Sequence, residues 1–428
     1  MRGLVASLLL AASSAAPPPA RFSTFPPGTP STTFPDGPFL GNGATGVVVG
    51  GAPGTITLYF ALSGFWSSGY GHNSSMPPLA EGPLSFPGCP SNNCSITVGL
   101  TLATVTLQSE ALAAKGASWA ATLDLAGARA DVALAAPGGF ALNLTCFVSA
   151  TTLLTVVEVQ NVGTAPLPIN FTLAANGNML NVPIASGCLD AAGGPAACPA
   201  PGGAALPGAW VTKDANPPGA QVAIPITAAL TARTLRSAGL SAASTSPYAA
   251  TVPHTPWTGG PAVATATTGT ATALTIAPGG GFTRALCAAA SRDPGVAPAS
   301  PLQFALAKVA AVAAADLPQL AAAHRAWWAA FFARSSVTLD PAASATEAFW
   351  WTSVYAMGAG SRAGGVVMDL WSPWRTTDYS AWRSNPTMDC ACCWCFVRGD
   401  CRVNPPPPPL PRLPPQTTSR RCTAAWWP

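Results

Sequence analysis

Short runs in which apolar and polar residues alternate occupy most of the first 300 residues, and this pattern constrains the fold more than any other feature. The clearest runs are 96–102, 141–148, 153–159 and 169–173. Period-two alternation, β-branched residues and intervening Gly, Pro and Asn are typical of strands. Many short strands over residues 36–298 predict a mainly β fold with one large antiparallel sandwich. The high alanine content weakens each strand assignment, because alanine is a poor strand former.

The periodicity becomes helical near residue 299. Residues 301–315 predict an alanine-rich helix, and Pro318 with Asp316 as N-cap predicts the start of a second one. One face of this second helix gathers Leu320, His324, Trp327, Trp328, Phe331 and Phe332. We interpret 299–340 as a helical linker and His324 as a buried residue with its hydrogen bonds satisfied.

A third helix is expected from Ser344, because Ser344-Ala345-Thr346-Glu347 has the pattern of a capping box. Its apolar stripe is expected to contain Phe349, Trp350, Ser353, Val354 and Met357. Glu347 is therefore interpreted as a capping residue, and Asp369 as a loop residue. Residues from 341 onward indicate the beginning of a helical domain.

The first 35 residues predict export. Residues 1–16 combine Arg2, a short apolar stretch and small residues, as in a secretory signal peptide. The apolar stretch is shorter than the roughly 20 residues that span a bilayer, although a signal anchor is the alternative. Residues 17–35 are a Pro/Ser/Thr-rich, extended lead-in. Four glycosylation triplets agree with a secreted or luminal protein that is free of the membrane after cleavage, at Asn73, Asn93, Asn143 and Asn170.

Cysteine spacing predicts disulfides, and the low charge limits the classes of partner that are expected. In an oxidising compartment, Cys89 with Cys94 and Cys188 with Cys198 are spaced for loop-closing disulfides. Only 8% of residues are charged and the net charge is +4, against roughly 25% charged residues in ordinary globular chains. The basic residues are scattered, so neither nucleic acid nor an anionic membrane is expected as a partner. No metal or other cofactor is expected.

A glycine-rich stretch, residues 39–51, contains Gly41-Asn42-Gly43 and Gly46. It lacks the Lys-Ser/Thr ending of a phosphate-binding loop, and no helical pattern follows it. It is therefore interpreted as a tight turn that leads into a strand. The next strand ends at Phe65-Trp66, an aromatic pair expected to be exposed.

Taken in order, three segments resemble glycoside hydrolase family 95 and its relative family 65. They are the Gly41–Gly46 turn with Phe65-Trp66, the aromatic linker 324–335, and residues 370–389. The similarity covers roughly residues 34–389. It implies a super-sandwich packed on an (α/α)6 barrel. It also implies inverting hydrolysis of α-L-fucosides and related galactosides, or phosphorolysis of disaccharides, with an oligosaccharide or glycoconjugate as substrate.

The resemblance also indicates site residues. Inverting hydrolysis needs a general acid and a second polar group that activates water, about 6.5–9.5 Å apart. Asp389 lies near the first of two water-holding asparagines of family 95, and Cys390-Ala391 occupies the place of the second. The general acid of the family lies further along the barrel. The expected sugar contacts, which could instead be packing or turn residues, are Trp371, Trp374, Asp378 and Trp382.

After Asp389 the pattern is lost, and residues 390–428 are a Cys/Pro-rich tail that we expect to be disordered. Its cysteines lack the spacing of a zinc site. We interpret the tail as the product of an unspliced intron or a frameshift. Residues 341–389 would then be only the start of the barrel, leaving Phe349, Trp350 and Trp351 exposed. The expected function is a truncated, inactive glycosidase-like protein. The alternatives are a non-catalytic carbohydrate-binding module, with Trp66 and the aromatic residues of 371–382 as platforms, and a secreted structural protein.

Overall fold

The computed structural model describes most of the chain between residues 36 and 378. The described residues are 20–22, 36–70, 96–176, 183–190, 192, 194–199, 208–214, 227–254, 263–291, 293, 295–296, 301–334, 337–363, 365 and 373–378. The predicted signal peptide, nearly all of the lead-in and the tail 390–428 lie outside these residues.

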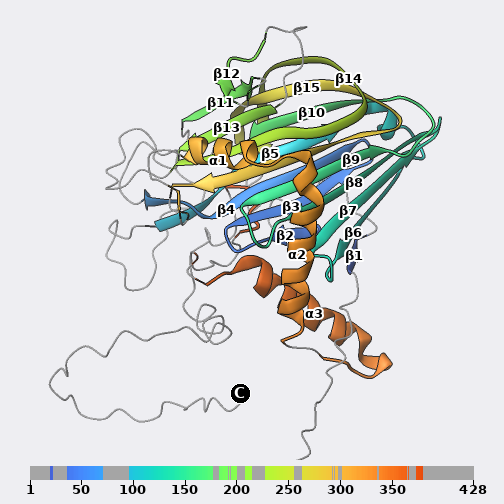
Figure 1. The fold of residues 1–428 in the computed structure, drawn as a ribbon, viewed down its shortest axis with the longest axis vertical. Coiled ribbons are helices and arrows are strands. Elements are labelled where there is room, and N and C mark those ends of the chain that lie inside the picture. Colours follow the sequence, from blue (N-terminus) through green and yellow to red (C-terminus); the bar gives the residue numbers. More distant parts are fainter. Residues whose placement is uncertain are drawn as a thin grey trace, which may run out of the picture.

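Fifteen strands and three α-helices make up the described part of the chain (Figure 1). The strands are β1 Ala20–Phe22, β2 Phe39–Gly41, β3 Thr45–Ala52, β4 Thr55–Tyr70, β5 Ile96–Gln108, β6 Ser118–Asp124, β7 Arg129–Ala136, β8 Phe140–Val148, β9 Leu154–Asn161, β10 Leu167–Ala175, β11 Ile184–Leu189, β12 Pro195–Ala196, β13 Gly208–Asp214, β14 Thr227–His254 and β15 Val263–Ala290. The helices are α1 Pro301–Ala310, α2 Leu317–Phe332 and α3 Ser344–Gly360, with short 3-10 turns at Glu110–Ala113, Ala314–Asp316 and Pro341–Ala343.

All strands belong to one antiparallel sheet that curls back on itself. The main path runs β1-β6-β7-β8-β9-β15-β10-β5-β4-β3-β2, while β11 to β14 form a branch joined through β14 to β15. β2 and β3 lie at one end of this path, yet they contact β7 and β8 near the other end. The two ends of the sheet therefore face each other and enclose a core between them. This arrangement confirms the mainly β, antiparallel sandwich.

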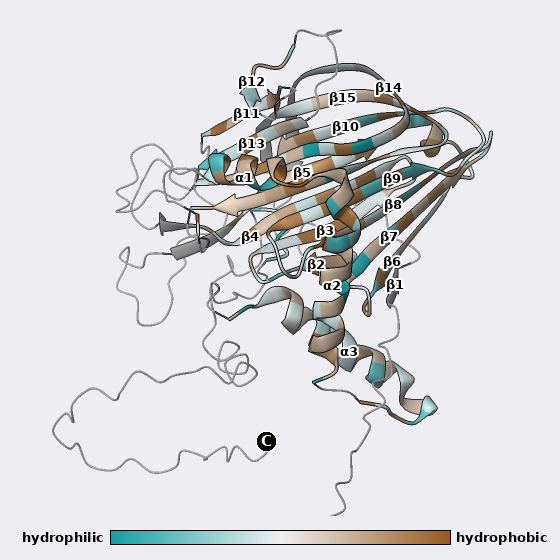
Figure 2. Ribbon diagram, in the orientation of Figure 1, coloured by the Kyte–Doolittle hydropathy of each residue, from teal (hydrophilic) through white to brown (hydrophobic). Residues whose placement is uncertain are grey.

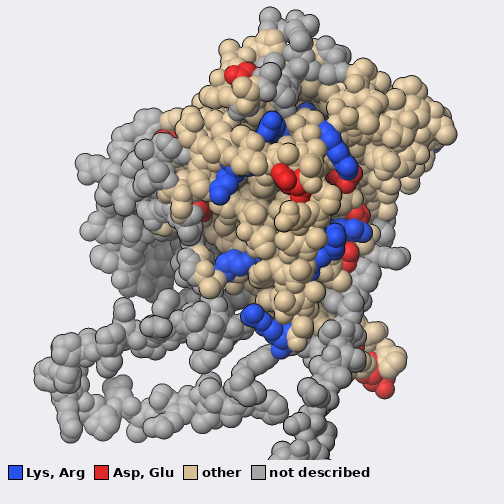
Figure 3. All heavy atoms as spheres, viewed as in Figure 1, with Lys and Arg blue, Asp and Glu red and all other residues tan. Residues whose placement is uncertain are grey.

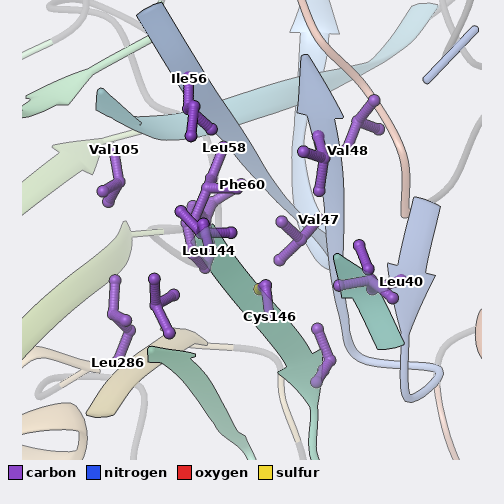
Figure 4. Close-up of a cluster of buried hydrophobic side chains, with 14 of the residues drawn as sticks. Leu40, Val47, Val48, Ile56, Leu58, Phe60, Val105, Leu144, Cys146 and Leu286 are labelled. Atoms are coloured by element: carbon purple, nitrogen blue, oxygen red, sulfur yellow. The ribbon is translucent and has the colours of Figure 1, made fainter. Parts of the chain in front are cut away.

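The core forms where the inward residues of facing strands meet. Leu40, Val47, Phe60, Leu144 and Leu286 are fully buried and converge from five strands (Figure 4). β7 shows the underlying pattern, since its buried and more exposed residues alternate along most of the strand. The sheet carries interspersed apolar and polar positions in Figure 2, as expected for strands with one face on the core.

α1 covers β14 and β15, and α2 and α3 pack on each other through aromatic rings. The rings of Trp328 and Tyr355 are 5.0 Å apart, and those of Phe332 and Trp351 are 5.7 Å apart. From Trp328 to Phe332 the position on α2 advances by four residues, while the contacted residue on α3 changes from Tyr355 to Trp351, four residues earlier. This pairing indicates that the two helices run in opposite directions. A helical region thus follows the sandwich in the described residues.

Three details of the helices differ from the sequence-based expectations. α1 ends at Ala310. Asp316 occupies the predicted N-cap position of α2, but its side chain makes no capping bond to this helix and accepts from the Ala313 amide. The capping box at Ser344 is absent, because the Glu347 carboxylate accepts from the Leu339 amide, 2.8 Å away. Asp340 accepts from the Ala342 amide just before α3.

The buried face of α3 also differs from the expected stripe. Trp351, Tyr355 and Ala359 are buried at every fourth position, whereas Phe349 is 75% exposed. Trp351, expected to be exposed, is only 1% exposed because it packs on Phe332. Within the described residues no helix by itself has the length and hydropathy to cross a membrane. α1 and the stretch Ala314–Phe332 meet that test only as a pair bent by 78°.

Candidate functional site

The predicted site residues divide into described and undescribed ones. Trp371, Trp382, Asp389, Cys89, Cys94, Asn73 and Asn93 lie outside the described residues. The structure places the remaining ones, which are Trp374, Asp378, Cys188, Cys198, Asn143 and Asn170. Cys188 and Cys198 form a disulfide in the structure, and Asn143 and Asn170 lie exposed on β8 and β10.

Trp374 is buried against the sheet and does not face solvent. Its side chain is 9% exposed, and its indole N–H donates to the Leu40 carbonyl oxygen at 2.8 Å. Its ring meets the edge of Phe39, with the centroids 4.8 Å apart. The expected stacking of Trp374 on a sugar does not fit this arrangement, and its packing alternative does.

Asp378 forms a buried ion pair with Lys213 of β13. The Lys213 Nζ lies 2.7 Å and 3.0 Å from the two carboxylate oxygens, and both side chains are at most 1% exposed. The amide and hydroxyl of Thr101 also donate to Oδ1, each at 2.8 Å. The expected role of Asp378 as a sugar contact therefore does not fit the structure either, because no part of the carboxylate is available to a ligand.

The Lys213 ammonium has partners beyond Asp378. It donates to the carbonyl oxygens of Thr101 and Asn176 at 3.0 and 2.9 Å. Burial lowers the pKa of Lys213, and the charge and hydrogen bonds of Asp378 act in the opposite direction. Four acceptors around one nitrogen favour the charged form, so we interpret the pair as ionic.

Residues 373–378, which we call the anchor segment, are held to the sheet at further points. The Asn176 side chain donates to the Thr376 carbonyl oxygen at 2.9 Å, and Arg375 Nη1 donates to the Leu62 carbonyl oxygen at 3.2 Å. The guanidinium of Arg375 occupies the space above Gly99, where any Cβ would lie 2.1 Å from Nε. The anchor segment is therefore a structural contact between the region after α3 and the sandwich.

His324 joins the linker helix α2 to the sandwich. Its Nδ1 accepts from the Ala150 amide at 3.1 Å, and Nε2 lies 3.0 Å and 3.2 Å from the carbonyl oxygens of Gly127 and Ala128. These three contacts fit a neutral imidazole ring that carries its proton on Nε2. Burial lowers the pKa of His324 to about 4. The interpretation of His324 as a buried residue with its hydrogen bonds satisfied is confirmed.

The Gly41-Asn42-Gly43 segment is the tight turn between β2 and β3 that the sequence predicts. The Asn42 side-chain oxygen accepts from the amides of Ala44 and Thr45 at 3.1 and 2.9 Å. Gly43 has a φ of +84°, a conformation that favours glycine. Phe65, expected to be exposed, is fully buried in the core, and Trp66 is partly buried.

This turn forms one wall of an open cavity of about 500 Å³, which we call the Asp293 cavity. The other walls come from the β8–β9 turn, the segment after β15, helix α1 and the segment after α3. The lining residues are Asn42, Gly43, Ala44, Ala150, Thr151, Thr152, Leu153, Asp293, Gly295, Phe304, Lys308, Arg362, Ala363 and Gly365. Segments far apart in the sequence thus meet at one site, which sequence periodicity alone does not reveal.

Asp293 is a buried carboxyl group at the wall of this cavity. It is 3% exposed, and Oδ2 accepts from the Ala290 amide at 2.7 Å. Oδ1 is buried and has no hydrogen-bond partner among the described residues. Burial raises the pKa of Asp293 to about 7, partly offset by the bond from Ala290. Sequence analysis missed this residue, whose only local signal is its place in the short 291–295 turn.

Two cationic side chains line the same cavity. Lys308 is exposed on α1, with its ammonium 5.1 Å from the centre of the Phe304 ring. The Arg362 guanidinium lies 3.9 Å from the centre of the Trp327 ring and donates to the Ser361 carbonyl oxygen at 2.9 Å. Figure 3 shows one face of the molecule, where basic and acidic side chains are interspersed rather than gathered in one patch.

Asp293, Lys308 and Arg362 are the charged side chains among the described lining residues of the Asp293 cavity. Asp293 is the one carboxyl group among its described lining residues, whereas the reaction requires two catalytic groups about 6.5–9.5 Å apart. A second cavity of about 520 Å³ lies beside Cys198 and Trp210, and its described lining residues include no charged side chain. Within the described residues, no group of three or more His, Cys, Asp or Glu could hold a metal ion.

Comparison with known proteins finds similarity at the level of solved structures. No protein-family model matches the sequence, and no curated protein matches it. A solved structure described as "Putative kojibiose phosphorylase from human microbiome" is similar with a TM-score of 0.48 and 11% sequence identity. The match covers 81% of this chain and 42% of that structure, so the chain spans less than half of its length.

Proposed function

We propose that this chain is the sandwich and linker portion of a secreted glycoside hydrolase-like protein, and that it has no turnover by itself. The sequence resemblance of residues 34–389 to families 95 and 65 motivates the proposal. The observation that carries it is the order of parts: a curled antiparallel sandwich, a linker helix fixed to it by His324, and an aromatic helical hairpin. This is the order that the resemblance implies.

The chemistry of the described residues supports the proposed lack of turnover. Asp378 is neutralised in an ion pair with Lys213, and Asp293 is the only described carboxyl group at its cavity. A general acid and a water-activating group are therefore not brought together in the described part of the chain. The specificity proposed by resemblance is for α-L-fucosides or related galactosides, with phosphorolysis of disaccharides as the family 65 alternative.

Activity assays test this proposal directly. The purified chain is incubated with 4-nitrophenyl α-L-fucoside and 4-nitrophenyl galactosides, and with disaccharides in the presence and absence of phosphate. We expect no release above that of a heat-treated sample. Steady, protein-dependent release of nitrophenol or of a sugar phosphate would contradict the proposed lack of turnover.

The tail hypothesis has a separate test. Residues 390–428 lie outside the described residues, and their origin from an intron or a frameshift stays a proposal. The transcript is sequenced across codon 390. We expect a spliced form that restores an asparagine within two codons of Asp389 and continues with a helical pattern. A spliced message that encodes the tail as it stands would exclude this origin.

A second candidate function is non-catalytic carbohydrate binding. The observation that favours it is the Asp293 cavity, which combines a single carboxyl group, two cations, Thr hydroxyls and the Phe304 ring. Carbohydrate sites commonly pair polar groups with an aromatic surface. Binding to a glycan array without any hydrolysis would support this function, and the absence of binding to every glycan would argue against it.

A further inference from the structure

Arg284 of β15 is a cation inside the sandwich that has no counterion. The residue is 3% exposed, and its guanidinium contacts the rings of Phe171 and Phe282, which belong to the hydrophobic core. Within the part of the chain that the structure describes, the guanidinium forms no ion pair, and Nε is fully buried without a hydrogen-bond partner. We propose that Arg284 is the binding site of one small monovalent anion, with chloride as the ligand.

The charge of Arg284 is the first argument for an anion. Burial lowers the pKa of this side chain to about 9, so the guanidinium still carries its charge at neutral pH. An unpaired charge in a protein interior is strongly unfavourable, and buried charges in native proteins are paired with an opposite charge. An anion beside the guanidinium supplies that opposite charge.

Another buried cation of the sandwich shows what Arg284 lacks. Lys213 is fully buried as well, but it has Asp378 as its counterion and donates to the carbonyl oxygens of Thr101 and Asn176. Around Arg284 the described contacts of the guanidinium are with aromatic rings alone. The same fold thus satisfies one buried cation with its own residues and leaves the other to an external partner.

The contact with Phe171 holds the guanidinium in place without using its N–H groups. The central carbon of the guanidinium lies 3.6 Å from the centre of the Phe171 ring and 5.5 Å from that of Phe282. At the shorter distance the planar guanidinium stacks on the ring by its face. Its N–H groups lie in its own plane, so an anion at the edge of that plane can accept two of them at once.

The neighbouring strands indicate a small anion that approaches from β14. Thr234 of β14 is paired directly with Arg284, so the two side chains share one face of the sheet, and Thr234 is partly exposed. Its hydroxyl is a further possible donor. On the other side the paired residue is Val157 of β9, which is fully buried and apolar. Arg284 lines neither of the two cavities described above, and a single-atom anion needs no cavity of that size.

Urea denaturation at neutral pH tests the proposal in sodium chloride and sodium gluconate at one ionic strength. Gluconate has the same charge as chloride but is much larger. Replacing gluconate by chloride, from about 5 mM to about 200 mM chloride, should lower the unfolding equilibrium constant of the unaltered protein about tenfold. This is the effect of an anion that binds only the folded state with a dissociation constant of roughly 10 mM.

Two variants assign the chloride effect to one side chain. Arg284→Met removes the guanidinium and keeps a flexible apolar side chain that can pack on Phe171, and its chloride effect should be less than about twofold. Arg325→Met is the matched control, because Arg325 is an exposed arginine of α2 and its loss changes the net charge equally. This control should keep the full effect. In gluconate, Arg284→Met should be at least as stable as the unaltered protein, since it removes a charge that has no counterion.

Chlorine NMR measures binding to the unaltered protein and so does not depend on whether a variant folds. We expect the folded protein to broaden the chloride resonance, and bromide to reverse the broadening when gluconate does not.

Three results would overturn the proposal. Equal stability of the unaltered protein in chloride and gluconate, or a chloride resonance that the folded protein does not broaden, would mean that no anion binds. A chloride effect of the same size in Arg284→Met and Arg325→Met would assign it to another part of the protein. None of these measurements involves a sugar or turnover, so their outcome is independent of the proposed function.

Discussion

The carboxyl groups of Asp378 and Asp293 are buried to nearly the same extent, but they differ in their hydrogen-bond and ion-pair partners. Asp378 is 2% exposed and receives the Lys213 ammonium and two donors from Thr101. Asp293 is 3% exposed, and one of its oxygens has no partner among the described residues. Burial alone therefore does not determine whether both oxygens of a carboxyl group have hydrogen-bond partners.

The difference lies in what each group connects. Asp378 and Lys213 are 165 residues apart and join the anchor segment to β13, within the sheet. Among the described residues, the Asp293 side chain accepts only from the amide of Ala290, three residues before it, and Asp293 lies at the wall of a cavity. The first network uses the full hydrogen-bonding capacity of the carboxylate for folding, whereas the second leaves part of that capacity unused.

Replacing Asp378 should give the largest effect. Asp378→Asn removes the negative charge and leaves the Lys213 ammonium buried without its counterion. We expect a loss of about 3–5 kcal/mol in the free energy of unfolding, as for other buried pairs in which one partner is removed. Urea denaturation monitored by tryptophan fluorescence measures it. Asp293→Asn is the matched control, and at pH 8 it should be neutral or stabilising because it removes an unpaired buried charge.

A double variant separates the ion pair from simple packing. Lys213→Met with Asp378→Leu removes both charges and keeps side chains of similar size. Its destabilisation should be smaller than that of Asp378→Asn alone, since no charge remains buried without a partner. If the double variant loses the sum of the two single losses, the pair has no coupling and the contrast between the two carboxyl groups fails.

The raised pKa of Asp293 should affect how the stability of the protein depends on pH. The pKa of Asp293 is raised from 3.8 to about 7 in the folded state. The folded protein therefore binds more protons than the unfolded chain between pH 4 and 7, and stability falls as the pH rises through this range. At about 1.4 kcal/mol per pKa unit, the upper limit of the loss is roughly 4 kcal/mol.

His324 acts in the opposite direction over nearly the same range. Its pKa is lowered from 6.5 to about 4 by burial, so the unfolded chain binds more protons and stability rises with pH between 4 and 6.5. The unaltered protein should thus show a shallow net slope. In Asp293→Asn only the His324 contribution remains, and its stability should rise clearly from pH 4 to 6.5. Parallel profiles for the two proteins would contradict the raised pKa of Asp293.

The sequence predicted the parts of the fold that are periodic. Alternation along β8 and β10 predicts strands because one face of each is buried, and the 3.6-residue pattern of α2 places Trp328 and Phe332 inside. In α3 nearly every position from Phe349 to Met357 is apolar or small, so periodicity does not select a face. The structure buries Trp351 and Tyr355 instead of Phe349, because these two meet rings of α2.

The candidate site could not be predicted in this way, because it depends on contacts between distant residues. The Asp378 position was singled out by its aromatic neighbours, but its partner Lys213 lies on a strand with no sequence relation to it. Asp293 follows a long strand in a turn and resembles an ordinary turn residue. The Asn42 turn was recognised, although its place at a cavity beside α1 follows only from how the sheet and helices pack.

A smaller effect is expected for Trp374, which tests whether the anchor segment is structural throughout. Trp374→Phe removes the indole N–H that donates to the Leu40 carbonyl oxygen and leaves that buried acceptor without its partner. We expect a loss of about 1–3 kcal/mol, measured by urea denaturation. No change in stability would indicate that Trp374 contributes little to the anchor and would reopen its predicted role as a sugar contact.

The smallest effect should come from Lys308, and it completes the contrast between the two regions. Lys213 and Lys308 have the same charge, but Lys213 is fully buried in an ion pair whereas Lys308 is exposed and forms no ion pair with a described residue. Lys308→Met should change the free energy of unfolding by no more than about 0.5 kcal/mol, as for most surface substitutions. Lys213→Met should cost several times more. A large loss in Lys308→Met would mean that this lysine supports the fold, and the contrast with Lys213 would then fail.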